Sequence, residues 1–254
     1  LGNLIHFFDA PWHYVPVWVF ITIPIFYSFF FILGLFDFIR NFFKNQKILI
    51  FIQDIFFLLL LTIPIVAVII LNSTLYDGWR HLYFIYPFFV IFVIKGFIFS
   101  IENLNKYKRI KKLLHIFILF VLLDTAIWMV KNHPHQYVYF NKLIRGFASE
   151  KFELDYLSAS YKTNYDFLIK NEKKDLYLIA DSGNRTKLFY SLFSLPETER
   201  LKFKVVEKGK AEYLITSYNL DDQIYDKKFY DKYKILNEVI VDGNKINSLF
   251  KLKK

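Results

Sequence analysis

Four long apolar segments occupy the first half of this chain, and they limit what it can fold into more than any other feature. They are Val15–Phe36, Ile48–Leu71, Leu82–Phe99 and Leu113–Val130. Because an α-helix rises about 1.5 Å per residue, helices of this length match a hydrocarbon core about 30 Å thick. The sequence therefore predicts a mainly α fold in residues 1–130, with four transmembrane helices.

The composition agrees with a location in a membrane. The chain is 55% hydrophobic and 21% aromatic, which is more apolar than soluble domains of this length usually are. Its formal net charge of +10 comes from short loops and from mixed charges in the second half, so no basic segment indicates a nucleic-acid partner. The sequence has no Cys, which excludes disulfides and thiolate metal sites.

Basic residues in the short loops predict the orientation, because Lys and Arg are kept on the cytoplasmic side of a membrane. They gather after the first and the third apolar segments, as Arg40, Lys44, Lys47, Lys106, Lys108, Arg109, Lys111 and Lys112. Residues 1–14 have no Lys or Arg, and residues 72–81 have only Arg80. We therefore expect a multi-pass protein of the cell (inner) membrane whose residues 131–254 lie outside the cytoplasm.

The second half has the patterns of a small α/β domain with a mixed sheet. The strands expected before the C-terminal hairpin are Asp175–Ala180, Phe203–Val206 and Glu212–Thr216, and Thr186–Phe193 has helical spacing. The strongest local signal is the Asp242-Gly243 turn between Lys234–Val241 and Lys245–Leu252, which predicts a β-hairpin. Residues 131–254 are therefore expected to form an extracytoplasmic α/β domain.

An Arg and a His stand together just before the third apolar segment. Arg80 can make a two-point contact with a phosphate, His81 can add a hydrogen bond, and Asp77 can orient either of them. This pattern predicts a site for a lipid-linked phosphate, formed by Arg80, His81, Asp77, Trp79, His13 and Tyr14. In the alternative interpretation Arg80 only extends to the membrane interface, where the aromatic rings also belong.

Other polar residues favour no definite chemistry. Asp54 and Asp124 lie within apolar segments, where a carboxylate marks a cavity or an ion pair unless it sits at the interface. His133 and His135 could bind a metal, but no third ligand is suitably spaced, so we expect no metal site. The turn at Asp181 lacks the repeated glycines of a dinucleotide loop, and we expect no cofactor.

Four segments carry a resemblance to a known family. They are PWHYVPVWVFITIP (Pro11–Pro24), YDGWRHLYFIYP (Tyr76–Pro87), HPHQYVYFNKLIRG (His133–Gly146) and FELDYLSASYK (Phe152–Lys162). Together they resemble the C-terminal half of bacterial polytopic glycosyltransferases of the GT-C fold group, which are similar to the dolichyl-phosphate-mannose protein mannosyltransferases. The resemblance is most specific at the Trp-Arg-His and Tyr-Phe-Asn sequences.

This resemblance implies an enzyme that transfers a sugar, with inversion, from a polyprenyl-phosphate carrier to a glycan, lipid or protein acceptor at the outer face of the membrane. In that group the catalytic carboxylate lies in the first outer loop. No matching loop is present here, so the resemblance implies the C-terminal part of a longer enzyme, without a catalytic residue of its own. Family members have Asp-Tyr-Trp where this chain has Asp155-Tyr156-Leu157, so a stacking role of the Trp does not carry over.

A second hypothesis is a non-catalytic membrane anchor or transporter subunit that displays its α/β domain for binding. Transport would predict interrupted helices and polar residues near the membrane centre in corresponding repeats, which the sequence does not contain. An anchor would make the Arg80 turn dispensable for function.

Overall fold

The computed structural model describes residues 10–43, 48–76, 78–181, 185–218 and 231–253. The chain divides into two compact units. The helical unit comprises the described residues up to Lys131 together with Tyr139–Arg145, and the α/β unit comprises Asn132–Val138 and the described residues from Gly146 onward. The chain thus returns to the helical unit once after leaving it.

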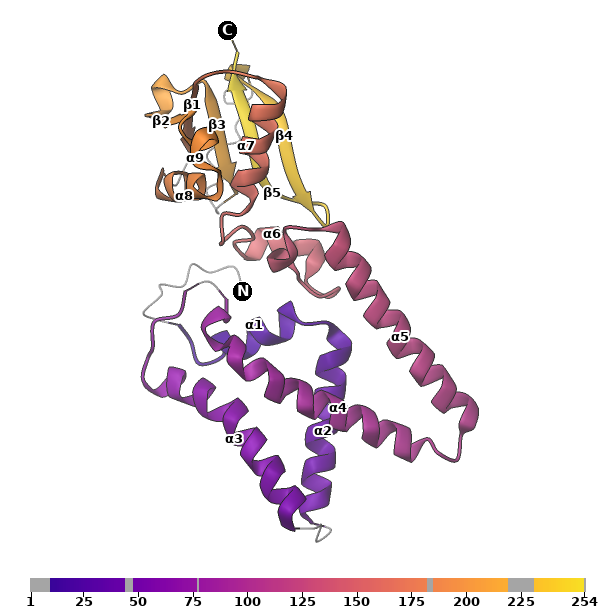
Figure 1. Cartoon of the computed structure of the whole chain (residues 1–254). Helices are drawn as coiled ribbons and strands as arrows, with labels where there is room; N and C mark the ends of the chain where they lie inside the picture. The colour runs from indigo at the N-terminus through magenta and orange to yellow at the C-terminus, as the bar shows by residue number, and fades with distance from the viewer. Residues whose placement is uncertain (1–9, 44–47, 77, 182–184, 219–230, 254) are drawn as a thin grey trace. The chain divides into compact units, whose positions relative to one another are not determined.

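The helical unit contains four long apolar helices (Figure 1). Its elements are α1 (Tyr14–Thr22), α2 (Ile25–Phe42), α3 (Ile48–Ile70), the 3-10 helix η1 (Arg80–Ile85) continuing into α4 (Tyr86–Asn103), and α5 (Lys108–Lys131). The segments Ile25–Phe42, Ile48–Ile70, Arg80–Asn103 and Lys108–Lys131 are each long and apolar enough to cross a membrane. They suggest a membrane protein.

The helix expected over Val15–Phe36 is divided into α1 and α2. Pro24 stands at the division, and Ile23 before it is extended, with φ −112° and ψ 153°. A proline has no N–H to continue a helix, and its ring disfavours the helical conformation in the residue before it. Helix α1 is therefore a separate element of 9 residues.

Helices α2 and α4 cross in direct backbone contact. A Cβ atom added to Gly34 would lie 1.9 Å from the carbonyl oxygen of Phe92, and one added to Gly96 would lie 1.9 Å from that of Phe30. The two helices also share a stacked aromatic pair, Phe31 and Phe89, with 4.4 Å between the ring centroids. Glycine at both positions lets the two backbones approach this closely.

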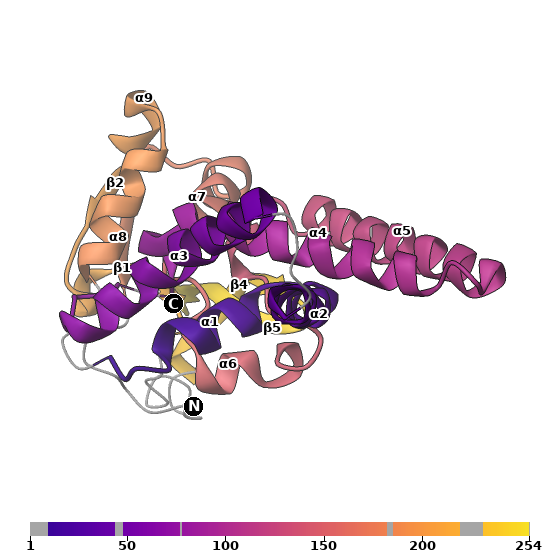
Figure 2. The ribbon, with the colours of Figure 1, turned by 90° about the horizontal axis from the view of Figure 1, so that it is seen from below.

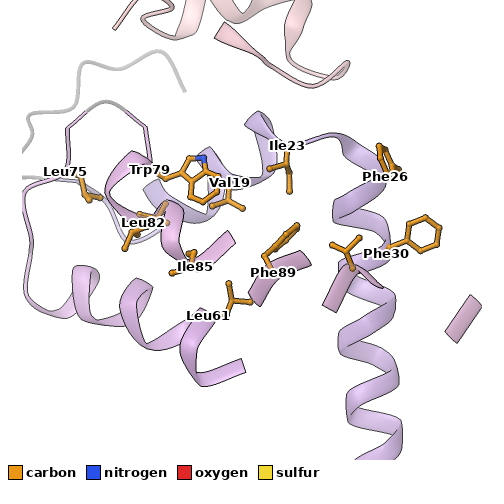
Figure 3. Close-up of a cluster of buried hydrophobic side chains, with 12 residues drawn as sticks. Val19, Ile23, Phe26, Phe30, Leu61, Leu75, Trp79, Leu82, Ile85 and Phe89 are labelled. Carbon is orange, nitrogen blue, oxygen red and sulfur yellow. The ribbon is translucent and has the colours of Figure 1, made fainter. Parts of the chain in front are cut away.

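The core of this unit joins α1 to the other helices (Figure 3). Val19 and Ile23 come from α1 and its end, Leu61 from α3, and Phe89 from α4. The segment around η1 contributes Leu75, Trp79, Leu82 and Ile85. The turn before α4 is therefore held in place by side chains that are buried in the core.

The α/β unit is built on a mixed sheet of five strands, as the sequence predicts. These are β1 (Tyr177–Asp181), β2 (Phe203–Val205), β3 (Tyr213–Ser217), β4 (Tyr233–Val241) and β5 (Asn244–Leu252), in the order β2-β1-β3-β5-β4. Strands β2, β1 and β3 are parallel, and β5 is antiparallel to both of its neighbours. Helices and 3-10 turns supply the rest: η2 (Gln136–Val138), η3 (Arg145–Phe147), α6 (Ala148–Lys151), α7 (Ser160–Asn171), α8 (Arg185–Ser191), η4 (Leu192–Ser194), α9 (Glu197–Arg200) and η5 (Lys208–Lys210).

The predicted hairpin is confirmed as β4 and β5. Asp242 and Gly243 both have positive φ, at 51° and 80°, which is the backbone of a type I′ turn. Helices α7 and α8 contribute Tyr161, Tyr165 and Leu188 to one hydrophobic core with the sheet, and α8 lies along β1 and β2 (Figure 2).

Candidate functional site

One face of α1 holds the turn that the sequence analysis singled out. Tyr14, Trp18 and Thr22 recur every four residues and so share a face of the helix. The backbone N–H of Gly78 donates to the Tyr14 hydroxyl at 3.1 Å, and the Trp79 indole Nε1 donates to Thr22 Oγ1 at 2.9 Å. Two hydrogen bonds thus fix the turn against α1.

Gly78 is required at its place in this turn. Its φ is +73°, in the left-handed region that disfavours residues with a side chain. The ring of Trp18 lies 3.7 Å from the position of an added Cβ, an ordinary packing distance. Backbone conformation, more than lack of space, therefore explains the glycine.

Arg80 and His81 lie next to a single aromatic ring, that of Tyr76. The guanidinium carbon of Arg80 is 5.9 Å from the centre of this ring, and the His81 ring is 5.5 Å from it, edge to face. Arg80 is half-buried, while His81 and Tyr76 are exposed. The predicted pair is thus gathered around one accessible ring, an arrangement able to present two nitrogen groups to an anion.

The other predicted site residues have separate outcomes. Tyr14 and Trp79 bind the turn to α1, as described above, and Trp79 is only 6% exposed. His13 is exposed at the N-terminus of α1, and its ring contacts Trp12 at 5.4 Å. Asp77 lies outside the described residues. Two of the six residues therefore serve the structure of the turn directly.

The Tyr-Phe-Asn segment, Tyr139–Asn141, also contacts α1, although it lies more than a hundred residues later in the sequence. Asn141 is 3% exposed; its side-chain amide donates to the carbonyl of Phe20 at 2.6 Å, and its backbone N–H donates to the carbonyl of Ile21 at 2.9 Å. Within a continuous helix the carbonyl of Phe20 would accept from residue 24, but Pro24 has no N–H. Asn141 therefore supplies the hydrogen bonds that the break in α1 removes.

Trp18 contacts both segments. Its ring lies against Gly78 and is 6.0 Å from the ring of Phe140. The turn at residues 78–79 and the residues Phe140 and Asn141 thus meet around α1. The sequence analysis did not identify Trp18, Thr22 or Asn141 as part of the site, although the four-residue spacing of Tyr14, Trp18 and Thr22 was a visible signal.

A second cationic group of the helical unit, Arg145, lies near the end of α5. The guanidinium of Arg145 lies over the rings of Trp128 and Tyr139, at 5.7 and 5.8 Å from their centres. Lys142 forms an ion pair of 2.9 Å with Asp124, and both side chains are largely exposed. Asp124 is therefore paired, as one of the two interpretations of its sequence position required.

Asp54 is paired as well. Both of its carboxylate oxygens contact the ammonium of Lys95, at 2.7 and 2.8 Å, across α3 and α4. The carboxylate is buried, so the ion pair offsets the cost of placing a charge there. This contact ties α3 to α4.

The two histidines after α5, His133 and His135, belong to the α/β unit. His133 Nδ1 is 2.9 Å from the Gln136 amide, and His135 is buried with Nε2 3.4 Å from the Thr163 hydroxyl. Burial lowers the pKa of His135, and the neighbouring His133 lowers it further. Among the described residues no group of three His, Asp or Glu side chains could hold a metal ion.

Asp155 centres a buried polar network in the α/β unit. Its carboxylate accepts short hydrogen bonds from the Tyr137 and Ser160 hydroxyls, and the Asn247 amide of β5 donates to the Ser160 hydroxyl at 2.8 Å. Burial raises the pKa of Asp155, although the hydrogen bonds from Ser160 and Tyr137 oppose this change. The network ties the Phe152–Lys162 segment to the sheet, which is a structural role.

Comparison of this chain with protein-family models, with curated proteins and with solved structures gives no match in any of the three.

Proposed function

We propose that this chain is part of a membrane glycosyltransferase that transfers a sugar from a polyprenyl-phosphate carrier to an acceptor at the outer face of the membrane. One observation carries the proposal. Segments far apart in the sequence meet around α1 and hold Arg80 half-buried beside His81, in a unit whose helices are long enough to cross a membrane. This is where a lipid-linked phosphate would be bound.

The chemistry needs such a cationic group. An acceptor oxygen attacks the anomeric carbon of the sugar, the bond from that carbon to the phosphate oxygen breaks, and the acceptor proton passes to a base. Negative charge then grows on the departing polyprenyl phosphate. Arg80 would stabilise this charge through two parallel N–H contacts, and His81 would donate one more hydrogen bond. The described residues of this chain supply no assigned base, in keeping with the family resemblance.

The orientation proposed for this site rests on loop charge. Eight Lys and Arg residues lie in the two stretches from the end of α2 to residue 47 and from residue 106 into the start of α5, among them Arg40, Lys106 and Arg109. By the positive-inside rule, those loops would be cytoplasmic, and the Arg80 turn and the α/β unit would lie on the opposite side.

The test is sugar transfer from a polyprenyl-phosphate donor by the reconstituted full-length protein. Arg80→Ala should lower kcat/KM by a factor that corresponds to about 2 to 4 kcal/mol of transition-state stabilisation. Arg80→Lys should also lower it, because an ammonium cannot reproduce the planar two-point contact of a guanidinium. His81→Ala should act in the same direction, but less strongly.

Arg109→Ala is the matched control, since Arg109 is an exposed Arg near the start of α5. It should leave transfer unchanged. Transfer at the wild-type rate by Arg80→Ala would refute the phosphate-binding role and favour the alternative of a membrane anchor that displays the α/β unit.

A further inference from the structure

An aromatic surface on the α/β unit is unexplained by the proposed site. Phe189, Tyr190 and Phe193 are between 50% and 67% exposed, and Leu201, which follows the Arg200 that stacks on Phe193, is 74% exposed. The ring of Phe189 contacts the rings of Tyr190 and Phe193, each at 5.7 Å between centroids. We call these four residues the aromatic patch. A contiguous exposed apolar patch of this kind marks an interaction surface.

The patch follows from the periodicity of α8 and η4. Leu188 and Leu192 are buried against the sheet, so the residues between and after them face outward. An open groove continues the patch toward the edge strand β2, and it is lined by Phe189 and Tyr190 of α8 and by Phe203 and Lys204 of β2. The exposed rings are thus a product of the fold and not of a loose segment.

Cations border the aromatic patch. The guanidinium of Arg200 stacks on the ring of Phe193 at 4.6 Å, and Lys204 is exposed beside the groove. Residues 185–210 contain seven Lys and Arg against three Glu. Such a surface complements a layer of anionic phosphates above an apolar interior.

We propose that the aromatic patch docks onto the phosphate and upper acyl layer of an anionic lipid bilayer. Phe189, Phe193 and Leu201 would enter the interface, while Arg200 and Lys204 would contact lipid phosphates. Two of the three rings are Phe, which have no polar atom to orient a sugar, so the patch fits a bilayer better than a glycan. The same chain carries four helices long enough to cross a membrane, and this tether keeps a bilayer at high effective concentration.

The absence of Cys makes the test direct, because a nitroxide label can be placed at one chosen position. Ser194→Cys in the full chain puts the label beside Phe193 and keeps all three rings, and Lys170→Cys puts it at an exposed position on α7 as the control. In vesicles of phosphatidylglycerol and phosphatidylethanolamine, the label at 194 should collide more with oxygen and less with a water-soluble nickel complex than the label at 170.

Variants separate the two parts of the proposal. Phe189→Ser with Phe193→Ser should make the label at 194 as accessible to nickel as that at 170. Lys204→Glu should lower the ratio of bilayer-inserted to water-exposed label at 194 by roughly fivefold or more. Lys234→Glu, on β4, should leave this ratio unchanged. High salt should act as Lys204→Glu does.

Two results would overturn the proposal. Equal nickel accessibility at 194 and 170 would mean that the patch stays in water. Shielding of the label at 194 from both oxygen and nickel would mean that a protein surface, such as a second copy of the chain, covers the patch.

Discussion

Asn141 illustrates how one side chain can stabilise a helix that another residue has broken. Pro24 leaves the carbonyl of Phe20 without its intrahelical donor, and Asn141 replaces that donor from more than a hundred residues away. The same side chain accepts a hydrogen bond from the N–H of Leu143 at 3.1 Å, which fixes the orientation of its amide. The position of α1 beside the Arg80 turn thus depends on a residue in a different part of the sequence.

Asn141→Ala should lower the free energy of unfolding of the helical unit by about 1 to 3 kcal/mol, because a buried carbonyl would lose its donor. Asn141→Asp should be no better, since a carboxylate is nearly isosteric with the amide but cannot donate to Phe20. Thermal unfolding in detergent micelles would measure both.

Asn103→Ala is the matched control for Asn141. Asn103 is exposed, and its amide donates to a carbonyl of its own helix, that of Phe99, at 2.7 Å. Its replacement should change the unfolding temperature little. An unfolding temperature for Asn141→Asp equal to that of the wild type would contradict the donor role of the amide.

At the scale of elements, local signals predicted the structure well where the decisive residues are neighbours in sequence. The Asp242-Gly243 turn joins β4 to β5 because two adjacent residues adopt positive φ. The break at Pro24 was missed because the apolar run continues through it, and hydropathy alone does not report an unpaired carbonyl. The convergence of the segments around α1 could not be predicted, since it depends on tertiary contacts such as that of Trp18 with Phe140.

The crossing of α2 and α4 yields a prediction at the same scale. Gly96→Ala should lower the free energy of unfolding by about 1 to 3 kcal/mol or more, because its new methyl group would meet the backbone carbonyl of Phe30 and force the helices apart. Gly34→Ala should lower it in the same way, because its methyl group would meet the backbone carbonyl of Phe92.

Gly146→Ala is the control for this crossing, because no atom lies within 4 Å of the Cβ that it would add. Unfolding temperatures in detergent should fall for the two crossing variants and stay unchanged for Gly146→Ala. A wild-type unfolding temperature for Gly96→Ala would mean that the helices can separate at no cost.

At the scale of the whole molecule, the structure describes two units, and the proposed orientation in a membrane rests on the Lys and Arg residues of the loops. If each of the four apolar helices crosses the membrane, an odd number of crossings separates the Arg80 turn, and likewise the α/β unit, from each basic loop. Both would therefore share one side of the membrane, opposite to the basic loops. The proposed donor site and the proposed docking of the aromatic patch are both compatible with that arrangement.

Single cysteines test this topology, since the chain has none of its own. Ser73→Cys, just before the Arg80 turn, and Lys170→Cys, in the α/β unit, should react with a membrane-impermeant thiol reagent added outside intact cells. Asn105→Cys, between α4 and α5, should react only after the membrane is permeabilised, because Lys106, Lys108 and Arg109 beside it are the kind of residues retained in the cytoplasm. Ser73 is partly shielded and can react slowly, so each position is compared with its own rate in detergent.

Protection of Ser73→Cys and Lys170→Cys together with labelling of Asn105→Cys would reverse the orientation and remove the Arg80 turn from the outer face. Labelling of only one of the first two positions would instead mean that either α4 or α5 does not cross the membrane.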